Sequence, residues 1–459
     1  MTSKGIPQAS VGTATPTAAH IVPGRRTADL EMHRRGIGAE GADMFLWPLP
    51  PLDYWPGRDA IATSLVSAAR AELPTSSLAT DALCILIVPL FLEALSIYTS
   101  QRIVEAFKHI GYDVLPPARG RVLQALATGT APPKPRLMYW LNVGPEVPRN
   151  LRAPVRFARD LVIQKHILRR ILRPIDLARD IVSTSVDALP ELHASRVDER
   201  VVYQRWHVWF DPQTAKPSAE HQRLANRAVD AIAAGFATTG TPFDAVCADG
   251  LRAWLAEAIS LVEAHCAGIA RRSALPRRLW TGSGGIVWNR ILQWAVRAAG
   301  GTAVGHDHGS GVGHVAPEIY RTMFEYETAD HFATFTASQA EGHKALFSPQ
   351  LLTAPRTVNV QGVADGRSAR IRASRKPTGR PRKVMLLSSY YFGDVVTCEG
   401  FVPDLPMLDF EVRLIAELKR RGYEVIYKPH PLIVTRPPHD MAVRLGAVEL
   451  ARPSEEVLH

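Results

Sequence analysis

The segment from Leu408 to Lys428 constrains the fold most tightly, because it reads as a helix followed at once by a buried strand. The helical pattern covers Leu408 to Arg421, Gly422 ends it, and the strand Tyr423 to Lys428 follows. With the apolar stretch Val384 to Leu387 upstream, this order predicts two parallel strands joined by a helix. The carboxyl end of such a strand lies at the sheet edge where ligands bind in open α/β proteins.

The same alternation of strand and helix recurs upstream, so we expect an α/β fold. The predicted strands and helices, in chain order, are strand Leu83 to Leu90, helix Glu93 to Ile110, strand Tyr112 to Leu115, strand Leu279 to Thr281, helix Ile286 to Ala299, strand Thr302 to Gly305, strand His331 to Thr336, helix Gln339 to Phe347 and strand Thr357 to Val360. Further helical patterns cover Asp176 to Asp187, Ala219 to Ala237 and Leu251 to Ala270. A weak last strand lies near Ala447 to Leu450.

The chain of 459 residues is long enough for two or three domains. The predicted organisation is a disordered tail 1–40, a Rossmann-like domain 41–364 with a helical insertion at about 145–270, a basic linker 365–382, and a second Rossmann-like domain 383–459. The last domain holds few strands for its class. We therefore expect it to be incomplete, and the chain to be a fragment or a truncated relative of a longer protein.

Charge and cysteine content narrow the partners and the compartment. The net charge is +10, which favours an anionic partner such as a nucleotide or an anionic lipid. No nucleic-acid-binding motif accompanies this charge, so we expect no nucleic-acid partner. The four cysteines are scattered, which indicates a reducing compartment and no zinc site. The longest apolar run, Ala82 to Leu92, is too short to span a bilayer, so a cytoplasmic protein is expected.

One basic amphipathic segment has two interpretations. In Val155 to Arg173, apolar residues recur at helical spacing and arginines and lysines fill much of the remainder. It can be a core helix with a solvated basic face, or a helix that docks on the anionic inner face of the plasma membrane.

Polar residues follow both strands of the last domain. Lys428 ends one strand and His430 lies two residues further, where a cation and an imidazole suit a phosphate group. Ser388, Ser389 and Tyr390 follow the neighbouring strand and can bind phosphate or sugar at the same edge. The sequence therefore predicts a nucleotide-phosphate site formed by these five residues.

A loop rich in histidine and glycine follows the predicted strand Thr302 to Gly305. In it, His308 is placed to act as a general base, and Asp307 to orient an imidazole. The alternative, a metal bound by His306, His308 and His314, lacks a supporting carboxylate pattern, so we expect no metal. Upstream, the loop Gly282 to Gly285 precedes a helix and is either an anion site or simply a tight turn.

Two of these motifs resemble those of bacterial capsule and surface-polysaccharide transferases. The His308-Gly309 turn and the Lys428-Pro429-His430-Pro431 turn stand in the same order and strand context as in the capsule Kdo transferases, the polysialyltransferases and the CDP-glycerol glycerophosphotransferases. The resemblance covers roughly 279–431. It implies a GT-B architecture with a cleft between two Rossmann-like domains. It also implies that His430 contacts the donor phosphate and that His308 acts on the acceptor, without a cofactor.

The expected function is therefore transfer of a sugar from a nucleotide-activated donor to a glycan or lipid-linked acceptor in surface-polysaccharide assembly. Two alternatives stay open. The first is a glycerophosphotransferase that uses CDP-glycerol and the same two histidines. The second is a catalytically degenerate GT-B-like module that binds a nucleotide or a partner without turnover. Family members carry a further phosphate-binding Ser/Thr turn later in the second domain, and the sequence ends before that turn would occur.

Overall fold

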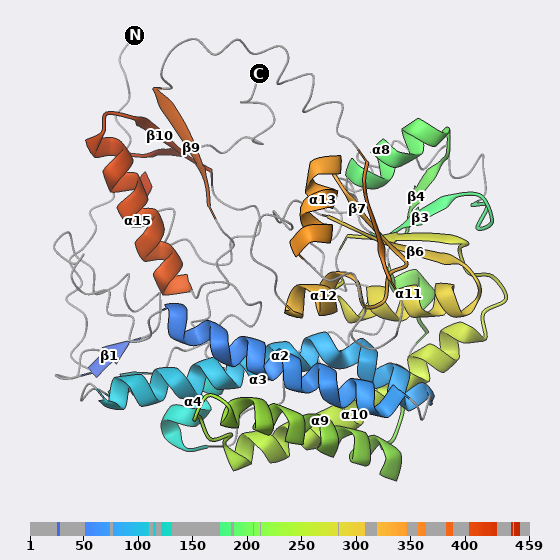
Figure 1. Ribbon diagram of the computed structural model, residues 1–459, viewed down its shortest axis with the longest axis horizontal. Helices are drawn as coiled ribbons and strands as arrows, with labels where there is room; N and C mark the ends of the chain where they lie inside the picture. Colours follow the sequence, from blue (N-terminus) through green and yellow to red (C-terminus); the bar gives the residue numbers. More distant parts are fainter. Residues whose placement is uncertain are drawn as a thin grey trace, which may run out of the picture. The chain divides into compact units, whose positions relative to one another are not determined.

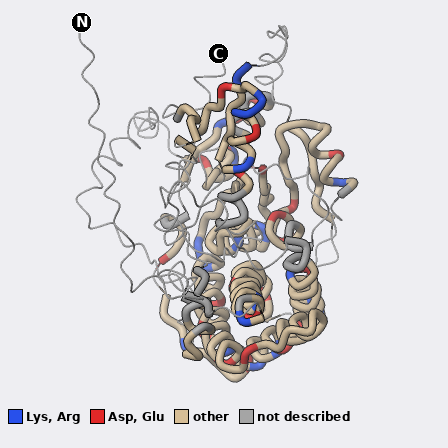
Figure 2. The backbone as a smooth tube through the Cα atoms, turned by 90° about the vertical axis from the view of Figure 1, so that its left-hand side faces the viewer, with Lys and Arg blue, Asp and Glu red and all other residues tan. Residues whose placement is uncertain are grey.

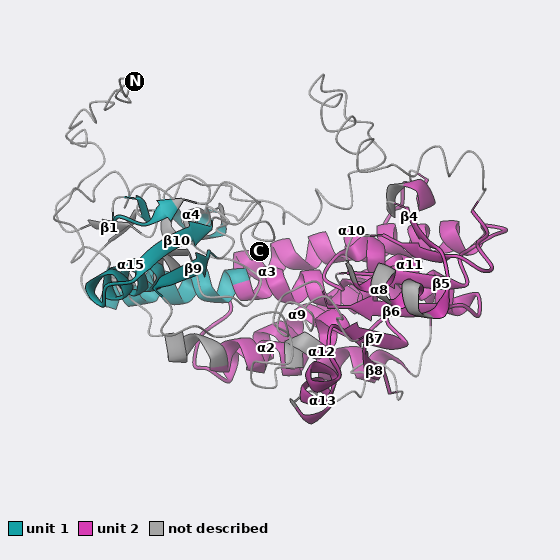
Figure 3. Ribbon diagram, turned by 90° about the horizontal axis from the view of Figure 1, so that it is seen from above, with its two compact units in different colours: residues 1–54, 96–133, 378–459 teal, residues 55–95, 134–377 magenta. Residues whose placement is uncertain are grey.

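The computed structural model describes two compact units of the chain (Figure 3). The residues it describes are 25–27, 51–73, 77–109, 113–115, 121–130, 175–184, 188–204, 206–211, 213–282, 284–307, 319–346, 357–363, 382–388, 404–428, 442–443 and 445–449. Unit 1 comprises Met1–Tyr54, Ser96–Pro133 and Thr378–His459, and unit 2 comprises Trp55–Leu95 and Lys134–Pro377. The boundary at Pro377 falls inside the predicted linker. The predicted amphipathic helix Val155 to Arg173 lies outside the described residues.

Unit 2 contains a six-stranded, fully parallel sheet with helices packed against it, which confirms the α/β prediction (Figure 1). Its strands are β3 (Ile181–Ser183), β4 (Val201–Tyr203), β5 (Arg278–Thr281), β6 (Thr302–His306), β7 (His331–Thr334) and β8 (Asn359–Gly362), in the spatial order β4-β3-β5-β6-β7-β8. The helices that connect them are α8 (Ala188–Val197), α11 (Val287–Ala298), α12 (Ile319–Glu325) and α13 (Ala337–Leu346). The predicted strands and helices from Leu279 to Val360 are thus confirmed within a few residues.

The strand order reverses between β3 and β5. From β3 the chain passes through α8 to β4 on one side, and from β5 it passes through α11 to β6 on the other. Right-handed crossovers that run in opposite directions place their helices on opposite faces of the sheet. The packing agrees, because Leu189 of α8 packs against Trp280 of β5, whereas Gln293 of α11 donates a hydrogen bond to the next residue, Thr281, at 2.6 Å. Because neighbouring residues on a strand point to opposite faces, the contacts of Trp280 and Thr281 place α8 and α11 on opposite faces of the sheet.

A further layer of long helices belongs to unit 2. It comprises α9 (Ala219–Ala237), α10 (Ala245–Ala270) and most of α2 (Pro51–Glu72). The carboxylate of Glu72 on α2 accepts hydrogen bonds from Arg223, at 2.7 Å, and Arg227 on α9. At Gly235 of α9 an added Cβ would lie 2.8 Å from the Cα of Ile61, so only glycine permits this close approach of α2 and α9.

The helix α3 (Leu78–His109) corrects two predictions, the strand Leu83 to Leu90 and the limit of the long apolar run to Ala82–Leu92. Leu83 to Leu90 is not a strand but the centre of this helix, because a fully buried apolar run has no periodicity that separates a strand from a helix. The stretch Leu78–Ala106 of this helix is 29 residues long with a mean hydropathy of 2.1, so in length and composition it could cross a membrane. However, 89% of its most apolar window is buried within the protein, as in the core helix of a folded domain.

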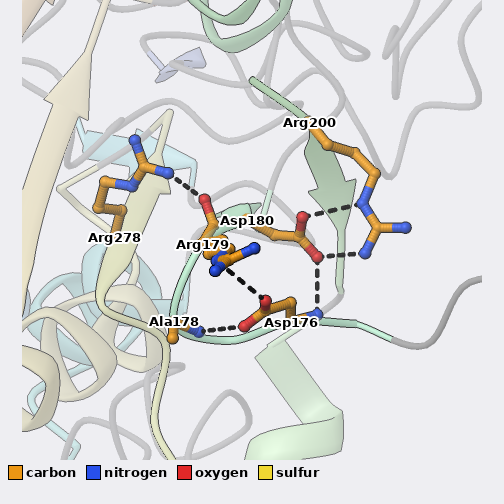
Figure 4. Close-up of polar contacts among 6 residues, drawn as sticks. All are labelled: Asp176, Ala178, Arg179, Asp180, Arg200 and Arg278. Atoms are coloured by element: carbon orange, nitrogen blue, oxygen red, sulfur yellow. Dashed lines mark hydrogen bonds and ion pairs between the residues drawn. The ribbon is translucent and has the colours of Figure 1, made fainter. Parts of the chain in front are cut away.

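The helix predicted over Asp176 to Asp187 is also wrong, because this segment contains a turn followed by β3. Acidic and basic side chains hold the turn and the amino ends of β3, β4 and β5 together (Figure 4). The Asp180 carboxylate accepts from Nε of Arg200 at 2.9 Å and from the Asp176 backbone N–H at 2.8 Å. Burial acts to raise the pKa of Asp180, but these hydrogen bonds hold it below its ordinary value.

Unit 1 contains a three-stranded parallel sheet in the order β11-β10-β9 (Figure 1). Its elements are β9 (Lys383–Leu387), α15 (Asp404–Arg420), β10 (Glu424–Lys428) and β11 (Val448–Glu449), as the sequence predicted. Ile415 of α15 packs on Val425 and Tyr427 of β10, and these residues form its small core. Unit 1 also contains α4 (Arg121–Thr128) and a parallel pair of short strands, β1 (Arg25–Thr27) and β2 (Asp113–Leu115).

Charged residues are spread over both units. Lys and Arg positions are interspersed with Asp and Glu positions along the described elements (Figure 2). Many are paired locally; at the end of α15, for example, the Glu417 carboxylate accepts from Arg420 and Arg421 at 2.6 Å. Such exposed pairs contribute little to stability. In the part of the chain that the structure describes, acidic and basic residues are therefore close to balance.

One fully buried cation links four segments of unit 2. The guanidinium of Arg290 on α11 donates to the carbonyls of Cys84 and Ile85 in α3, at 3.0 and 2.8 Å. It also donates to Gly284 in the loop after β5, at 3.2 Å, and to Met323 in α12, at 2.9 Å. Burial lowers the pKa of Arg290 to about 10, which still leaves it charged at neutral pH.

We predict that Arg290→Met will destabilise the protein by about 3 kcal/mol or more. The substitution preserves much of the side chain but removes the charged donor of four hydrogen bonds to carbonyls, and a buried group left unpaired costs about 1–3 kcal/mol. The matched control is Arg252→Met, which removes a partly exposed ion pair with Asp230 at 2.9 Å and should cost under about 1 kcal/mol. Urea denaturation of the three proteins measures the difference, and equal effects of the two substitutions would contradict the assignment.

A second prediction concerns His265 on α10, whose ring packs edge-on against Trp288 at 4.9 Å and Phe210 at 5.7 Å. Burial lowers the pKa of His265 to about 4. The unfolded chain therefore binds a proton at higher pH than the folded one, and stability present above pH 6.5 falls as the pH drops towards 4. We expect the wild type to lose about 2 kcal/mol between pH 7 and pH 5 from this group.

The variant His265→Phe keeps an aromatic ring in this position but cannot be protonated. Its unfolding free energy should therefore fall less than that of the wild type between the same two pH values. Chemical denaturation at pH 5, 6 and 7 measures both slopes. Parallel slopes for the wild type and the variant would show that His265 is not the group responsible.

Candidate functional site

In unit 2, the carboxyl end of β6 brings His306 and Asp307 to the ligand-binding edge of the sheet. Asp307, a predicted catalytic residue, is 1% exposed. Its carboxylate accepts a hydrogen bond from Nε2 of Gln339 on α13, and its backbone N–H donates to the carbonyl of Ala333 at 2.9 Å. The carboxylate is thus held by a neighbouring helix, which fixes its position at the strand end.

His306 is part of the protein interior. It is fully buried, its Nδ1 lies 3.1 Å from the carbonyl oxygen of Asp307, and its ring lies 5.9 Å from that of Trp280. No group of three or more metal-ligating side chains occurs among the described residues. The other histidines of the alternative metal site, His308 and His314, lie outside those residues.

In unit 1, the structure brings two predicted phosphate-binding residues together. Lys428 is the last residue of β10, and Ser388 directly follows β9, its neighbour in the parallel sheet. The Ser388 backbone N–H donates to the Lys428 carbonyl at 2.9 Å. The half-buried lysine therefore stands at the carboxyl edge of the sheet, as expected for a residue that meets a ligand there.

The Ser388 hydroxyl is held by two buried side chains. It accepts a hydrogen bond from the Tyr427 hydroxyl at 2.7 Å and donates to the Glu411 carboxylate at 3.3 Å. The Tyr427 hydroxyl also lies 3.0 Å from the Glu411 carboxylate. Burial, and then the charge of Glu411, raise the pKa of Tyr427, so the phenol stays protonated and remains a donor. In this arrangement Ser388 anchors the loop after β9 and does not present a free hydroxyl.

The sequence carried a signal for this polar group that the initial prediction did not use. Glu411 lies on the same helical stripe as Ile415 and Leu418, four and seven residues later, so it is an acidic residue on an apolar face. Tyr427 lies two residues after Val425 on the strand, so both side chains point to the same core. Gln339, the partner of Asp307, had no comparable local signal.

The remaining predicted site residues stay predictions. His308 lies in the loop after Asp307, and His430 lies two residues after Lys428, both outside the described residues. Ser389 and Tyr390, directly after Ser388, lie outside them as well. At the upstream loop, the structure places Gly284 so that a Cβ there would meet the carbonyl oxygen of Phe324 at 1.6 Å. The close approach of the α12 backbone thus accounts for this glycine.

Comparison with known proteins found no matching family model, no matching curated protein and no matching solved structure. The fold defines a parallel α/β protein, with Asp307 at the carboxyl edge of one sheet and Lys428 at the carboxyl edge of the other.

We predict that Tyr427→Phe will destabilise unit 1 by about 1–3 kcal/mol. The ring still fills its place against Ile415, but the buried Glu411 and Ser388 lose a hydrogen-bond donor. Tyr423→Phe is the control, because Tyr423 precedes the same strand in a less buried position. Hydrogen exchange of β9 and β10 amides measures the effect, and unchanged protection in Tyr427→Phe would contradict it.

Proposed function

We propose that the protein is a GT-B-type glycosyltransferase of surface-polysaccharide assembly, with two Rossmann-like domains and a nucleotide-activated sugar as donor. The observation that supports this most directly is the pair Lys428 and Ser388, at the carboxyl ends of adjacent parallel strands joined by α15. A lysine at this edge supplies a positive charge where a donor phosphate would bind. The order of the His308 and Lys428 turns in the chain, described above, adds the resemblance to capsule transferases.

The proposed reaction is a substitution, so the protein has to orient the donor and acceptor and neutralise the charge of the leaving phosphate. An acceptor hydroxyl oxygen forms a bond to the anomeric carbon of the donor, and the bond from that carbon to the phosphate oxygen breaks. The nucleoside phosphate leaves with the electron pair, and Lys428 and His430 stabilise its charge. His308 takes the proton of the acceptor hydroxyl as general base. Asp307, held by Gln339, keeps the backbone at the start of the His308 loop in place.

The proposed partners follow from the same chemistry. The donor is a nucleotide-activated sugar and the acceptor is a glycan or a lipid-linked glycan. We place the protein in the cytoplasm, with Val155 to Arg173 as the segment that would contact anionic lipid at the inner face of the membrane.

We predict that Lys428→Met will weaken nucleotide binding by about tenfold or more, because a hydrogen bond to a charged group contributes about 1.5–3 kcal/mol. The matched control is Lys383→Met, which removes a lysine from the opposite, amino end of the same sheet. Lys383 pairs with Glu424 at 3.1 Å and is exposed, so this change should leave the affinity unaltered. Isothermal calorimetry with CMP, CDP and UDP measures both variants.

Calorimetry together with transfer assays on nucleotide sugars and CDP-glycerol separates the proposal from its alternatives. Equal affinities in the two lysine variants, or no binding by the wild type, would contradict the phosphate site. Binding together with transfer of glycerol phosphate from CDP-glycerol would identify a glycerophosphotransferase instead. Binding without turnover of any donor would identify a non-catalytic nucleotide-binding module.

A further inference from the structure

In the six-stranded sheet, none of the predicted catalytic or phosphate-binding residues that the structure describes lies at the carboxyl ends of β3 and β5. Because the strand order reverses between β3 and β5, the connections that leave these two strands diverge at their carboxyl ends. In open α/β sheets this is the position where ligands bind. Thr184, the first residue after β3, lies here, and its backbone N–H donates to the carbonyl of Trp280 on β5 at 3.1 Å.

The segment after β4 also lies beside the carboxyl end of β3. The backbone N–H of Gln204, directly after β4, donates to the carbonyl of Ser183 at 2.8 Å. A short helix, η3 (Trp206–Trp209), follows, and the ring of Phe210 then lies 4.7 Å from the ring of Trp288 in the first turn of α11. The segment after β4 therefore reaches the start of α11, which follows β5, and Thr184 lies beside β5 at the same edge of the sheet.

Among the described residues of these segments, three buried side-chain atoms have no hydrogen-bond partner. They are Oγ1 of Thr184, Oε1 of Gln204 and Nε1 of Trp209, and Trp209 is only 5% exposed. A buried polar atom without a partner costs about 1–3 kcal/mol, and native proteins contain few of them. Three such atoms around one sheet edge point to a polar molecule that pairs with them.

The start of α11 lies next to this group. Its N-cap residue is Ile286, whose side chain cannot accept a hydrogen bond, so no side chain caps the first turn. The three unpartnered atoms combine a hydroxyl, an amide oxygen that accepts and an indole N–H that donates. This mixture of donors and acceptors matches the hydroxyl groups of a sugar or other polyol.

Charge argues for a neutral ligand over an acidic one. None of the three unpartnered side chains is a cation. Asp307 lies at the end of β6, the strand next to β5, and its carboxylate disfavours a nearby anion. We propose that the carboxyl edge of the sheet at β3 and β5 binds a neutral sugar or polyol through Thr184, Gln204 and Trp209. These residues all belong to unit 2, so the proposal does not rest on the nucleotide site of unit 1.

The sharpest test is Thr184→Val, which keeps the side-chain shape and removes only the hydroxyl. Since this hydroxyl has no partner in the unliganded protein, the variant should be as stable as the wild type or more stable. Its affinity for the bound sugar should fall about tenfold. The matched control is Thr241→Val, because Oγ1 of Thr241, between α9 and α10, is also buried without a partner. That control should gain the same stability and keep the wild-type affinity.

Saturation-transfer NMR and calorimetry on the full chain supply the measurements, with glucose, galactose, N-acetylglucosamine and glycerol as neutral probes and glucuronate as the anionic one. We expect a neutral probe to bind the wild type and to shift the indole N–H signal that Trp209→Phe removes. Binding of no probe, or of glucuronate alone, overturns the proposal. So does an affinity that falls equally in the two threonine variants or in neither. Loss of stability in Thr184→Val would show that the hydroxyl already has a partner.

Discussion

The fold of unit 2 depends on a single buried guanidinium. Arg290 reaches from α11 to carbonyl groups of α3, α12 and the loop after β5, so one side chain fixes the positions of three other segments. Each of these carbonyls accepts a hydrogen bond from the guanidinium. The charge itself stays favourable because Glu325 and Glu327 lie close enough to stabilise it. Helices that have no regular hydrogen bonds to one another are therefore joined by a polar centre inside an apolar layer.

The strand–helix–strand segments that have clear periodicity and a glycine after the helix were predictable from the sequence. The β5–α11–β6 and β9–α15–β10 units followed from apolar spacing and from Gly300 and Gly422, both of which adopt positive φ. The failures were of two kinds. The buried centre of α3 is apolar on every side and carries no periodicity. β3 and β4 span three residues each and take their place through neighbouring strands, which no local pattern encodes.

For the candidate sites too, part of the arrangement was predictable from the sequence and part was not. Lys428 and Ser388 could be placed side by side in advance, because the carboxyl ends of adjacent parallel strands share one edge. The contacts that hold the sites depend on distant parts of the chain: Gln339 reaches Asp307 from another helix, and Glu411 reaches Ser388 from α15. Ser388 illustrates the limit, since its sequence context suggested a ligand contact and its hydroxyl is instead part of a buried polar group.

The arrangement of the central strands has a consequence for how the protein folds. β3 and β5 are adjacent in the sheet, yet the whole of residues 184–277, including α9 and α10, separates them in sequence. Closing so long a loop costs more entropy than joining β5 to β6 across α11 alone. The half from β5 to β8 should therefore form first, with β3 and β4 added only after α9 and α10 have paired. The reversal of strand order would then be the last part of the sheet to assemble.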